Sequence, residues 1–246
     1  MSMAQQDEWF TTWFDSPYYH ILYNNRNALE AQQFMDNLLA YLHPKPHEKI
    51  LDLACGKGRH SVYLNKKGFD VTGIDLSEHS IAYAKQFENK RLHFVVHDMR
   101  EVYEPESFDF IFNLFTSFGY FDNETENVVA LVAVLQSLKY GGKLVIDFMN
   151  TDLTIAGLVT EEEKEVQGIT FKIHRGVEHG FIVKTIRFAD QGCDYCFVER
   201  VRALRKEDFL EYFAMAKLRL VEVFGDYNLN PYEGDKSKRM IFVLKK

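Results

Sequence analysis

Two glycines and two carboxylates lie at spacings that suit the binding of an adenine nucleoside. Gly56 and Gly58 follow an apolar run that contains Asp52, and Asp75 ends the next apolar run, DVTGID. A glycine turn after a first strand lets backbone atoms approach a ligand. An acid at the tip of the second strand accepts hydrogen bonds from ribose hydroxyls. The pattern therefore predicts a nucleoside site at two adjacent strand ends.

The glycine turn departs from the fingerprint of dinucleotide-binding proteins, G-x-G-x-x-G, because Ser61 stands at the third glycine position. Asp52 lies four residues before Gly56, where a carboxylate repels a pyrophosphate but suits a ligand with ammonium and sulfonium charges. Lys57 and Arg59 favour a phosphate-binding site, unless both side chains point to solvent. An NAD(P)-linked oxidoreductase is therefore disfavoured and stays an alternative.

Five blocks in order and spacing resemble the class I S-adenosylmethionine-dependent methyltransferases. They cover roughly residues 26–150, and the one clear departure is Tyr140, where the family usually has proline. Five ordered blocks are a specific signal, whereas each block alone is weak. The blocks are LDLACGKG at 51–58, GIDLS at 73–77, HDM at 97–99, FDFIFN at 108–113 and LKYGGKLVIDF at 138–148.

The resemblance implies a cofactor site for S-adenosylmethionine. In that site Asp75 would bind both ribose hydroxyls, Asp98 would accept from the adenine amino group, and the Met99 backbone amide would donate to the ring. The full set of implied cofactor residues is Asp52, Ala54, Gly56, Gly58, Asp75, Leu76, Asp98, Met99, Asn113, Leu114, Tyr19, Tyr23 and Arg26.

The last three of these residues come from the leading segment WFDSPYYHILYNNR at 13–26, which resembles the segment that covers the cofactor in related enzymes. We expect Tyr19 and Tyr23 to bring an aromatic face near the sulfonium and Arg26 to lie near a carboxylate. The alternative is an amphipathic helix packed on the sheet.

The acceptor is expected to be a small molecule. Asn113 stands where methyltransferases of nucleic-acid amino groups continue with two prolines, but here Leu114 follows. The formal net charge of −7 also disfavours nucleic acid. Tyr120 and Asn113 are the candidate catalytic residues, with Tyr120 as a proton acceptor or a wall contact, although Tyr120 is more simply a packing aromatic. A catalytically silent nucleoside-binding protein on the same fold stays open.

Alternating helix and strand patterns predict an α/β fold, a doubly wound, mostly parallel sheet of seven strands. Residues 164–174, 181–188 and 195–202 instead alternate apolar and polar side chains, which predicts a small antiparallel insertion after the fifth strand. We expect it to roof the active site. The predicted organisation is a lid segment at 1–25, a core at 26–156 and 204–246, and the insertion at 157–203. The core strands are expected at 49–53, 69–74, 92–96, 108–114, 143–149, 218–224 and 240–244, and the helices at 26–41, 59–67, 78–88, 124–138 and 206–216.

Composition indicates a cytoplasmic protein. The three cysteines form no disulfide framework, and neither a secretory signal nor a membrane span is evident. Cys193 and Cys196 match C-x-x-C, but no histidine pair completes a metal site, so no metal is expected. Asp147 and Asn150 are similar to the metal ligands of catechol-type enzymes, an idea weakened by Asn113 in place of an acid. A monomer or a homodimer is expected.

Overall fold

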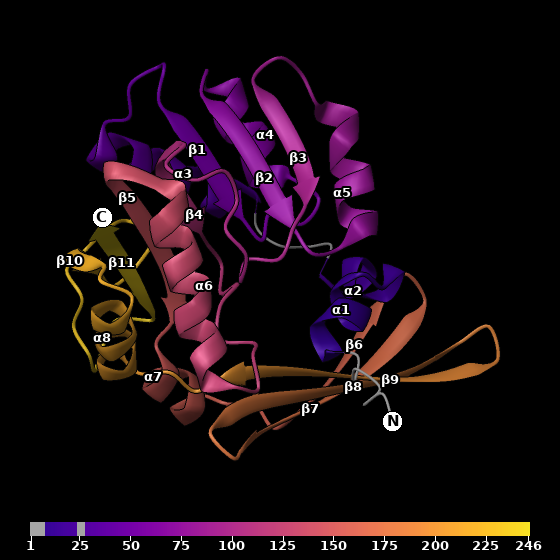
Figure 1. Ribbon diagram of the computed structural model, residues 1–246. Helices are drawn as coiled ribbons and strands as arrows, with labels where there is room; N and C mark the ends of the chain where they lie inside the picture. Colours follow the sequence, from indigo (N-terminus) through magenta and orange to yellow (C-terminus); the bar gives the residue numbers. More distant parts are fainter. Residues whose placement is uncertain (1–7, 24–27) are drawn as a thin grey trace, which may run out of the picture. The chain divides into compact units, whose positions relative to one another are not determined.

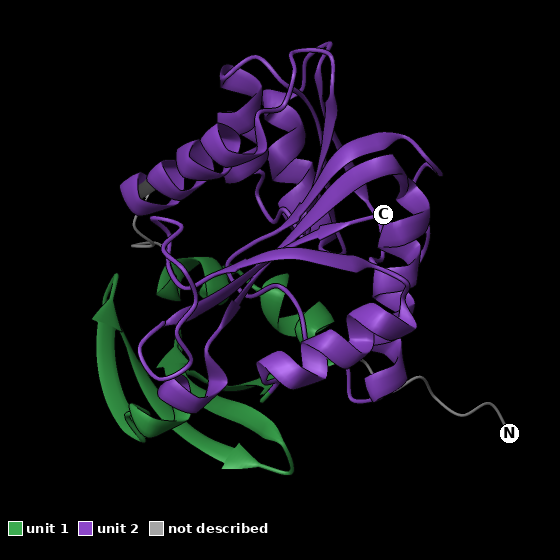
Figure 2. Ribbon diagram, turned by 90° about the vertical axis from the view of Figure 1, so that its left-hand side faces the viewer, with its two compact units in different colours: residues 1–26, 155–203 green, residues 27–154, 204–246 purple. Residues whose placement is uncertain are grey.

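The computed structural model describes residues 8–23 and 28–246, and the chain divides into two compact units (Figure 2). One unit comprises residues 27–154 and 204–246, and the other comprises residues 1–26 and 155–203. The unit of the antiparallel strands therefore includes the N-terminal segment, which the sequence patterns assign to a separate lid. Within the described part of the chain, every helix is too short or too polar to span a membrane.

The larger unit is built on a seven-stranded sheet with the order β10-β11-β5-β4-β1-β2-β3 (Figure 1). The strands β1 to β5 are parallel, and β11 pairs antiparallel with both β5 and β10. The predicted fold class is confirmed. The strands are β1 (Lys49–Leu53), β2 (Asp70–Asp75), β3 (Leu92–Val96), β4 (Phe108–Asn113), β5 (Leu138–Met149), β10 (Arg219–Phe224) and β11 (Arg239–Lys245).

Helices connect these strands, and two of them begin at residues whose side chains cap the helix N-terminus. Ser77 caps its helix by accepting a hydrogen bond from the Ser80 N–H at 3.0 Å, as its position in the sequence predicts. Asn123 caps the helix after β4 through the Thr125 N–H at 3.1 Å. The helices of this part of the chain are α3 (Ala28–Leu42), α4 (Arg59–Lys66), α5 (Glu78–Ala84), the 3₁₀ turn η1 (Lys85–Phe87), α6 (Glu124–Ser137), α7 (Thr151–Ala156) and α8 (Lys206–Met215).

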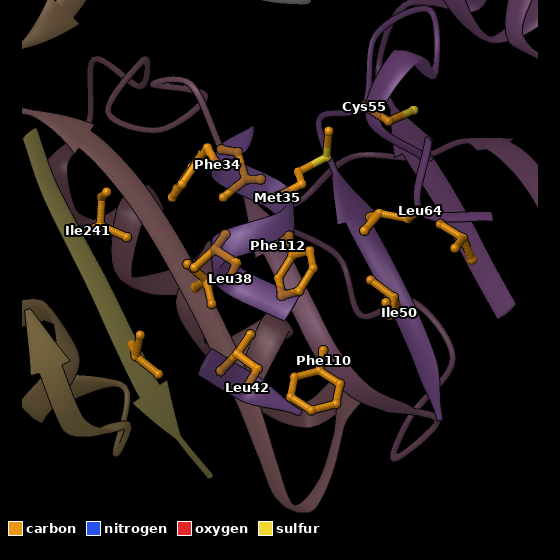
Figure 3. Close-up of a cluster of buried hydrophobic side chains, with 14 of the residues drawn as sticks. Phe34, Met35, Leu38, Leu42, Ile50, Cys55, Leu64, Phe110, Phe112 and Ile241 are labelled. Atoms are coloured by element: carbon orange, nitrogen blue, oxygen red, sulfur yellow. The ribbon is translucent and has the colours of Figure 1, made fainter. Parts of the chain in front are cut away.

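Apolar side chains cover both faces of the sheet. On one face, Phe34 and Leu38 of α3 belong to the same cluster of buried side chains as Phe110 and Phe112 of β4 (Figure 3). On the other, Phe209 of α8 packs its ring against Phe148 and Phe242, with ring centres 5.1 and 4.8 Å apart. Burying one such side chain contributes about 1.5–3 kcal/mol. Helices on both faces hold the strand ends in fixed positions.

The prediction that Gly141 and Gly142 separate a helix from a strand starting at residue 143 is wrong. β5 begins at Leu138, directly after α6, and contains both glycines. Its pairing with β4 shifts register between Phe108 and Phe110. Gly141 has φ +80°, and a Cβ at Gly142 would lie 3.0 Å from the Lys139 carbonyl oxygen. The glycines therefore permit a bulge within the strand.

The smaller unit contains a four-stranded antiparallel sheet with the order β6-β7-β8-β9. The expected strand over 164–174 is wrong in its limits, because Gln167 and Gly168 form a turn with φ +54° and +80° that splits it into two strands. Trp13 of the N-terminal helices is fully buried against this sheet. The elements are α1 (Trp9–Phe14), α2 (Pro17–Leu22), β6 (Glu161–Val166), β7 (Ile169–Glu178), β8 (Phe181–Asp190) and β9 (Cys193–Arg202).

Candidate functional site

The candidate site lies at the carboxyl edge of the parallel strands in the larger unit. β1 lies between β2 and β4, with Asp52 opposite Gly73 on one side and Phe112 on the other. The direction of the chain across the sheet reverses at this point, since β1 connects to β2 whereas β4 follows β3. Ligands of open α/β sheets bind in the crevice at such a reversal.

The two glycines of the turn after β1 have different roles. Gly56 has φ +54°, and a Cβ added there would meet nothing within 4 Å. Gly58 has φ +74°, and its Cβ would lie 2.4 Å from Cε1 of Phe94. Gly56 therefore leaves open space beside the turn, where a ligand can approach backbone atoms, whereas Gly58 is required by packing. Ala54, just before them, also has a positive φ, +60°.

Phe94 is a residue of the site region that the sequence analysis missed. Its ring lies against both the glycine turn and β2, because a Cβ at Gly73 would lie 2.7 Å from Cδ1 of Phe94 and 2.9 Å from Sγ of Cys55. The ring therefore fixes the spacing between Gly58 and Gly73. The only sequence signal for this packing was Gly73 in GID, because a glycine inside a strand often marks close packing.

Asp75 ends β2 and is held by backbone amides. Its Oδ2 accepts a hydrogen bond from the Gly56 N–H at 2.7 Å, and its Oδ1 accepts one from the Ser77 N–H at 2.9 Å. The alternative that Asp75 merely caps α5 does not hold, because Ser77 is the N-cap. The carboxylate therefore lies beside the open space at Gly56. Leu76, the next residue, is 37% exposed at this edge.

Asp52 is buried, with 3% of its surface exposed, and Oδ2 accepts a hydrogen bond from the Ser61 hydroxyl at 2.5 Å. Burial raises the pKa of Asp52 to about 6; the Ser61 hydrogen bond opposes this rise, and the nearby charge of Asp75 adds to it. Ser61, which distinguishes this turn from the dinucleotide fingerprint, therefore serves to hold Asp52.

Asp98 follows β3 and is paired with Arg100, which the sequence analysis did not identify. The guanidinium contacts both carboxylate oxygens, with Nε 3.0 Å from Oδ1 and Nη2 2.6 Å from Oδ2. Burial raises the pKa of Asp98, but hydrogen bonds from Arg100 and its charge outweigh burial and hold the pKa below its ordinary value. Arg100 also contacts Glu126 at 2.8 Å. Asp98 therefore stays ionised, next to the partly buried Met99.

Asn113, the last residue of β4, is 1% exposed and joins two strand ends. Its Nδ2 donates to the Leu53 carbonyl oxygen at 3.3 Å and to the Ser117 carbonyl oxygen at 3.1 Å. Its Oδ1 has no hydrogen-bond partner among the residues that the structure describes. A buried acceptor without a donor is costly, so Oδ1 is suited to a ligand donor. Leu114 is buried beside it, and the Tyr120 hydroxyl donates to the Thr116 carbonyl oxygen.

Tyr19 and Tyr23, two of the residues expected from the leading segment, belong to the smaller unit. The Tyr23 hydroxyl donates to Oε1 of Glu199 at 2.6 Å and receives a contact from Lys184. Tyr19 packs with Tyr23, with ring centres 4.9 Å apart. Arg26 lies outside the described residues. The lid function of these three residues stays a prediction.

Asp147 is not placed as a metal ligand. Its carboxylate is fully buried and pairs with Arg239, with Nε of Arg239 2.7 Å from Oδ1. Asn150 donates from Nδ2 to the carbonyl oxygens of Gly234 and Ser237, each at 2.8 Å. Over residues 8–23 and 28–246, no group of three or more His, Cys, Asp or Glu side chains is arranged to hold a metal ion.

Comparison with known proteins agrees with this geometry. Residues 50–142 match the family described as "Methyltransferase domain". The chain is 32% identical over 237 residues to a glycine/sarcosine N-methyltransferase of Aphanothece halophytica, covering 92% of this chain and 85% of that protein. It is 26% identical over 256 residues to a protein of Geobacillus sp. (strain WCH70) whose name describes a methyltransferase, covering 97% and 99% of the two chains.

Solved structures share the fold. An S-adenosylmethionine-dependent methyltransferase from Clostridium acetobutylicum superposes with a TM-score of 0.77 at 19% identity, over 93% of this chain and 95% of that one. An amino pentose methyltransferase from Micromonospora echinaspora with bound S-adenosylmethionine gives 0.68 at 20% identity, over 94% and 97%. The open space at Gly56 and the carboxylates beside it fit a cationic nucleoside. The chain therefore belongs to the class I S-adenosylmethionine-dependent methyltransferases, and S-adenosylmethionine is its cofactor.

Proposed function

We propose that this enzyme methylates an amine nitrogen of a small molecule. The observation that carries the proposal is that the acids of the strand edge are all hydrogen-bonded to protein donors: Asp52 to Ser61, Asp75 to Gly56 and Ser77, Asp98 to Arg100, and Asp147 to Arg239. Each of these acids is thus already engaged by a protein donor, and none is placed to act as a general base. An amine that enters as the free base needs no general base, whereas a hydroxyl does.

The similarity to relatives supports nitrogen as the methylated atom. The matching protein of Aphanothece halophytica acts on glycine and sarcosine, and the matching structure from Micromonospora echinaspora acts on an amino pentose. Both names describe small acceptors that carry an amino group. Nucleic acid stays disfavoured by the net charge of −7 and by the absence of a Pro-Pro pair after Asn113.

Within the proposed site, each residue has a separate task. Gly56 admits the ligand to the backbone, Asp75 binds the ribose hydroxyls, and Asp98 with the Met99 amide binds adenine. Asp52 and Oδ1 of Asn113 face the positive methionine end, where an ammonium group supplies the missing donor. Tyr120 is a wall residue, because its hydroxyl is engaged by the Thr116 carbonyl.

The sulfonium of the bound cofactor would supply the methyl group, and the neutral thioether is a good leaving group. With S-adenosylmethionine bound, the nitrogen lone pair of the acceptor would form the new C–N bond as the C–S bond breaks to give S-adenosylhomocysteine, and the surplus proton would pass from nitrogen to water. The protein has mainly to align the acceptor with the methyl group and exclude water, which contributes about 7–11 kcal/mol.

Several sequence-based expectations stay part of this proposal. They are a cytoplasmic location, a monomer or homodimer, and an insertion that roofs the active site. The exposed free thiols of Cys193 and Cys196 are in keeping with a reducing compartment.

Two measurements test the proposed function. Calorimetry should detect binding of S-adenosylmethionine and no binding of NAD. Formation of S-adenosylhomocysteine should then be followed with glycine, sarcosine, a nucleotide-linked amino sugar, a catechol and a short oligonucleotide. Turnover with an amine supports the proposal. Turnover only with the catechol or the oligonucleotide contradicts it, and binding without any turnover favours the silent nucleoside-binding alternative.

A further inference from the structure

Asp147 gathers donors from three separate segments at the carboxyl end of β5. The Phe115 N–H donates to Oδ2 at 2.8 Å, Nε of Arg239 donates to Oδ1 at 2.7 Å, and the Tyr227 hydroxyl lies 3.3 Å from Oδ2. The carboxylate is fully buried. Both oxygens are therefore engaged by the protein itself.

The segment that Asp147 holds has an unusual backbone. Phe115 and Thr116 are consecutive non-glycine residues with φ +60° and +63°. A β-branched residue rarely adopts a positive φ, because its side chain is crowded against the backbone. Such conformations persist only where surrounding contacts over-determine them, and they concentrate at functional sites.

Three contacts fix Thr116 in this conformation. Its N–H donates to the Asp147 carbonyl oxygen at 3.0 Å, and its Oγ1 accepts from Nη2 of Arg239 at 2.9 Å. Its carbonyl oxygen accepts from the Tyr120 hydroxyl. The Asp147–Arg239 pair thus controls both the backbone and the side chain of this residue.

The same segment also holds Asn113. The next residue, Ser117, receives the Asn113 Nδ2 on its carbonyl oxygen at 3.1 Å. The shape of residues 114–117 therefore determines how the carboxamide of Asn113 is oriented, and with it the direction of the unpartnered Oδ1. A shift in this loop would be transmitted directly to the last residue of β4.

We propose that Asp147, paired with Arg239, is a positioning residue that holds residues 114–117 in the strained conformation required for methyl transfer. The proposal rests on the proposed function, since it concerns the same strand edge. It assigns Asp147 no contact with the acceptor and no proton transfer. Its effect acts through Phe115, Thr116 and Ser117 on Asn113.

The test compares Thr116→Val with Thr116→Ser in the full-length protein. Valine keeps the volume and removes the acceptor for Arg239, whereas serine keeps a hydroxyl. Asp147→Asn is the second variant, and Asp109→Asn is its matched control. Like Asp147, Asp109 accepts hydrogen bonds from a backbone N–H, that of Lys49 at 2.8 Å, and from a cationic side chain, that of Lys139 at 2.7 Å. Asp109 lies at the opposite end of β4 from Asn113.

Two readouts are needed. Hydrogen exchange of residues 114–117, measured by mass spectrometry with S-adenosylmethionine bound, reports the loop. Steady-state methyl transfer reports catalysis. It is measured with the amine that the wild-type protein methylates fastest among the acceptors tested for the proposed function. We expect Thr116→Val and Asp147→Asn to speed loop exchange about tenfold and to lower kcat more than they raise KM.

The serine variant and Asp109→Asn should stay within about twofold of wild type in both readouts. Unchanged exchange with reduced turnover in Thr116→Val would show direct contact with the acceptor and overturn the proposal. Wild-type exchange and kinetics in both test variants would overturn it as well. Failure of the proposed function is distinguishable, because it appears in the wild-type protein as a lack of turnover with every amine.

Discussion

The backbone N–H of Gly56 donates a hydrogen bond to Oδ2 of Asp75 across 2.7 Å. The glycine turn after β1 and the acid at the end of β2 therefore support each other without any ligand contact. A carboxylate offers about four acceptor sites, so it can hold the turn and also receive hydroxyl groups. The turn and the proposed ribose acid are therefore linked in one structural feature.

Asp75→Ala should weaken binding of S-adenosylmethionine by about 10- to 100-fold, because hydrogen bonds to a charged group contribute about 1.5–3 kcal/mol. Isothermal calorimetry measures this loss. Asp70→Ala, at the other end of the same strand, is the control and should bind normally. Equal affinities for both variants would contradict the role of Asp75.

Alanine substitutions at the two glycines of the turn should have different effects, one on cofactor binding and the other on the stability of the fold. Gly56→Ala adds a methyl group in the open space of the site and should mainly weaken cofactor binding. Gly58→Ala drives a methyl group into the Phe94 ring and should lower the free energy of unfolding by about 2–4 kcal/mol. Urea unfolding and calorimetry on both variants check this.

Gly68→Ala is the control for backbone strain alone, since Gly68 has φ +104° and no atom within 4 Å of an added Cβ. Its loss of stability should be smaller than that of Gly58→Ala, and its cofactor affinity should be unchanged. The opposite ranking of Gly58 and Gly68 would show that Phe94 does not limit the space at the turn.

Asp52 should make the protein less stable as pH rises. Its folded pKa, about 6, lies above the ordinary value of 3.8, so between these values the folded state holds a proton that the unfolded state has lost. The free energy of unfolding then falls as pH increases from about 4 to 6, and below about 4 the penalty is absent. Urea unfolding from pH 4 to 7 should show a flatter profile for Asp52→Asn than for wild type.

Binding of S-adenosylmethionine near pH 6 should release a proton. The positive charges of the cofactor favour ionised Asp52 and lower its pKa on binding. Calorimetry in buffers with different ionisation enthalpies measures the proton count. Asp52→Asn should abolish the release, and its persistence in that variant would assign the proton to another group.

The arrangement of the proposed binding motif could be predicted because the motif is local in the chain. Asp52, Gly56 and Asp75 lie within 24 consecutive residues, and each stands at the end of a strand with a clear apolar pattern. Arg239, in contrast, lies 92 positions from its partner Asp147. Only the antiparallel pairing of β11 with β5 brings them together, and a single sequence contains no signal for that pair.

The predicted bounds of strands were wrong where the sequence contains no clear turn signal. The turn Gln167-Gly168 contains neither asparagine nor aspartate, and β6 (EEEKEV) is too polar to show alternation, so residues 164–174 are predicted as one strand. The turn Gln191-Gly192 has the same two residue types, but the predicted strands at 181–188 and 195–202 on either side of it alternate clearly, so they are predicted as separate strands. The presence of glycine alone does not predict a break between elements, because Gly141 and Gly142 lie within β5.

Nε1 of Trp13 donates to Oε1 of Glu199 at 2.6 Å across 186 positions of the chain. During synthesis on the ribosome, the N-terminal helices therefore emerge long before the strand that buries Trp13. Proteins usually fold their N-terminal parts first, but these helices have to wait until β9 has been translated. The aromatic side chains around Trp13 therefore lack part of the sheet that covers them until β9 has been made.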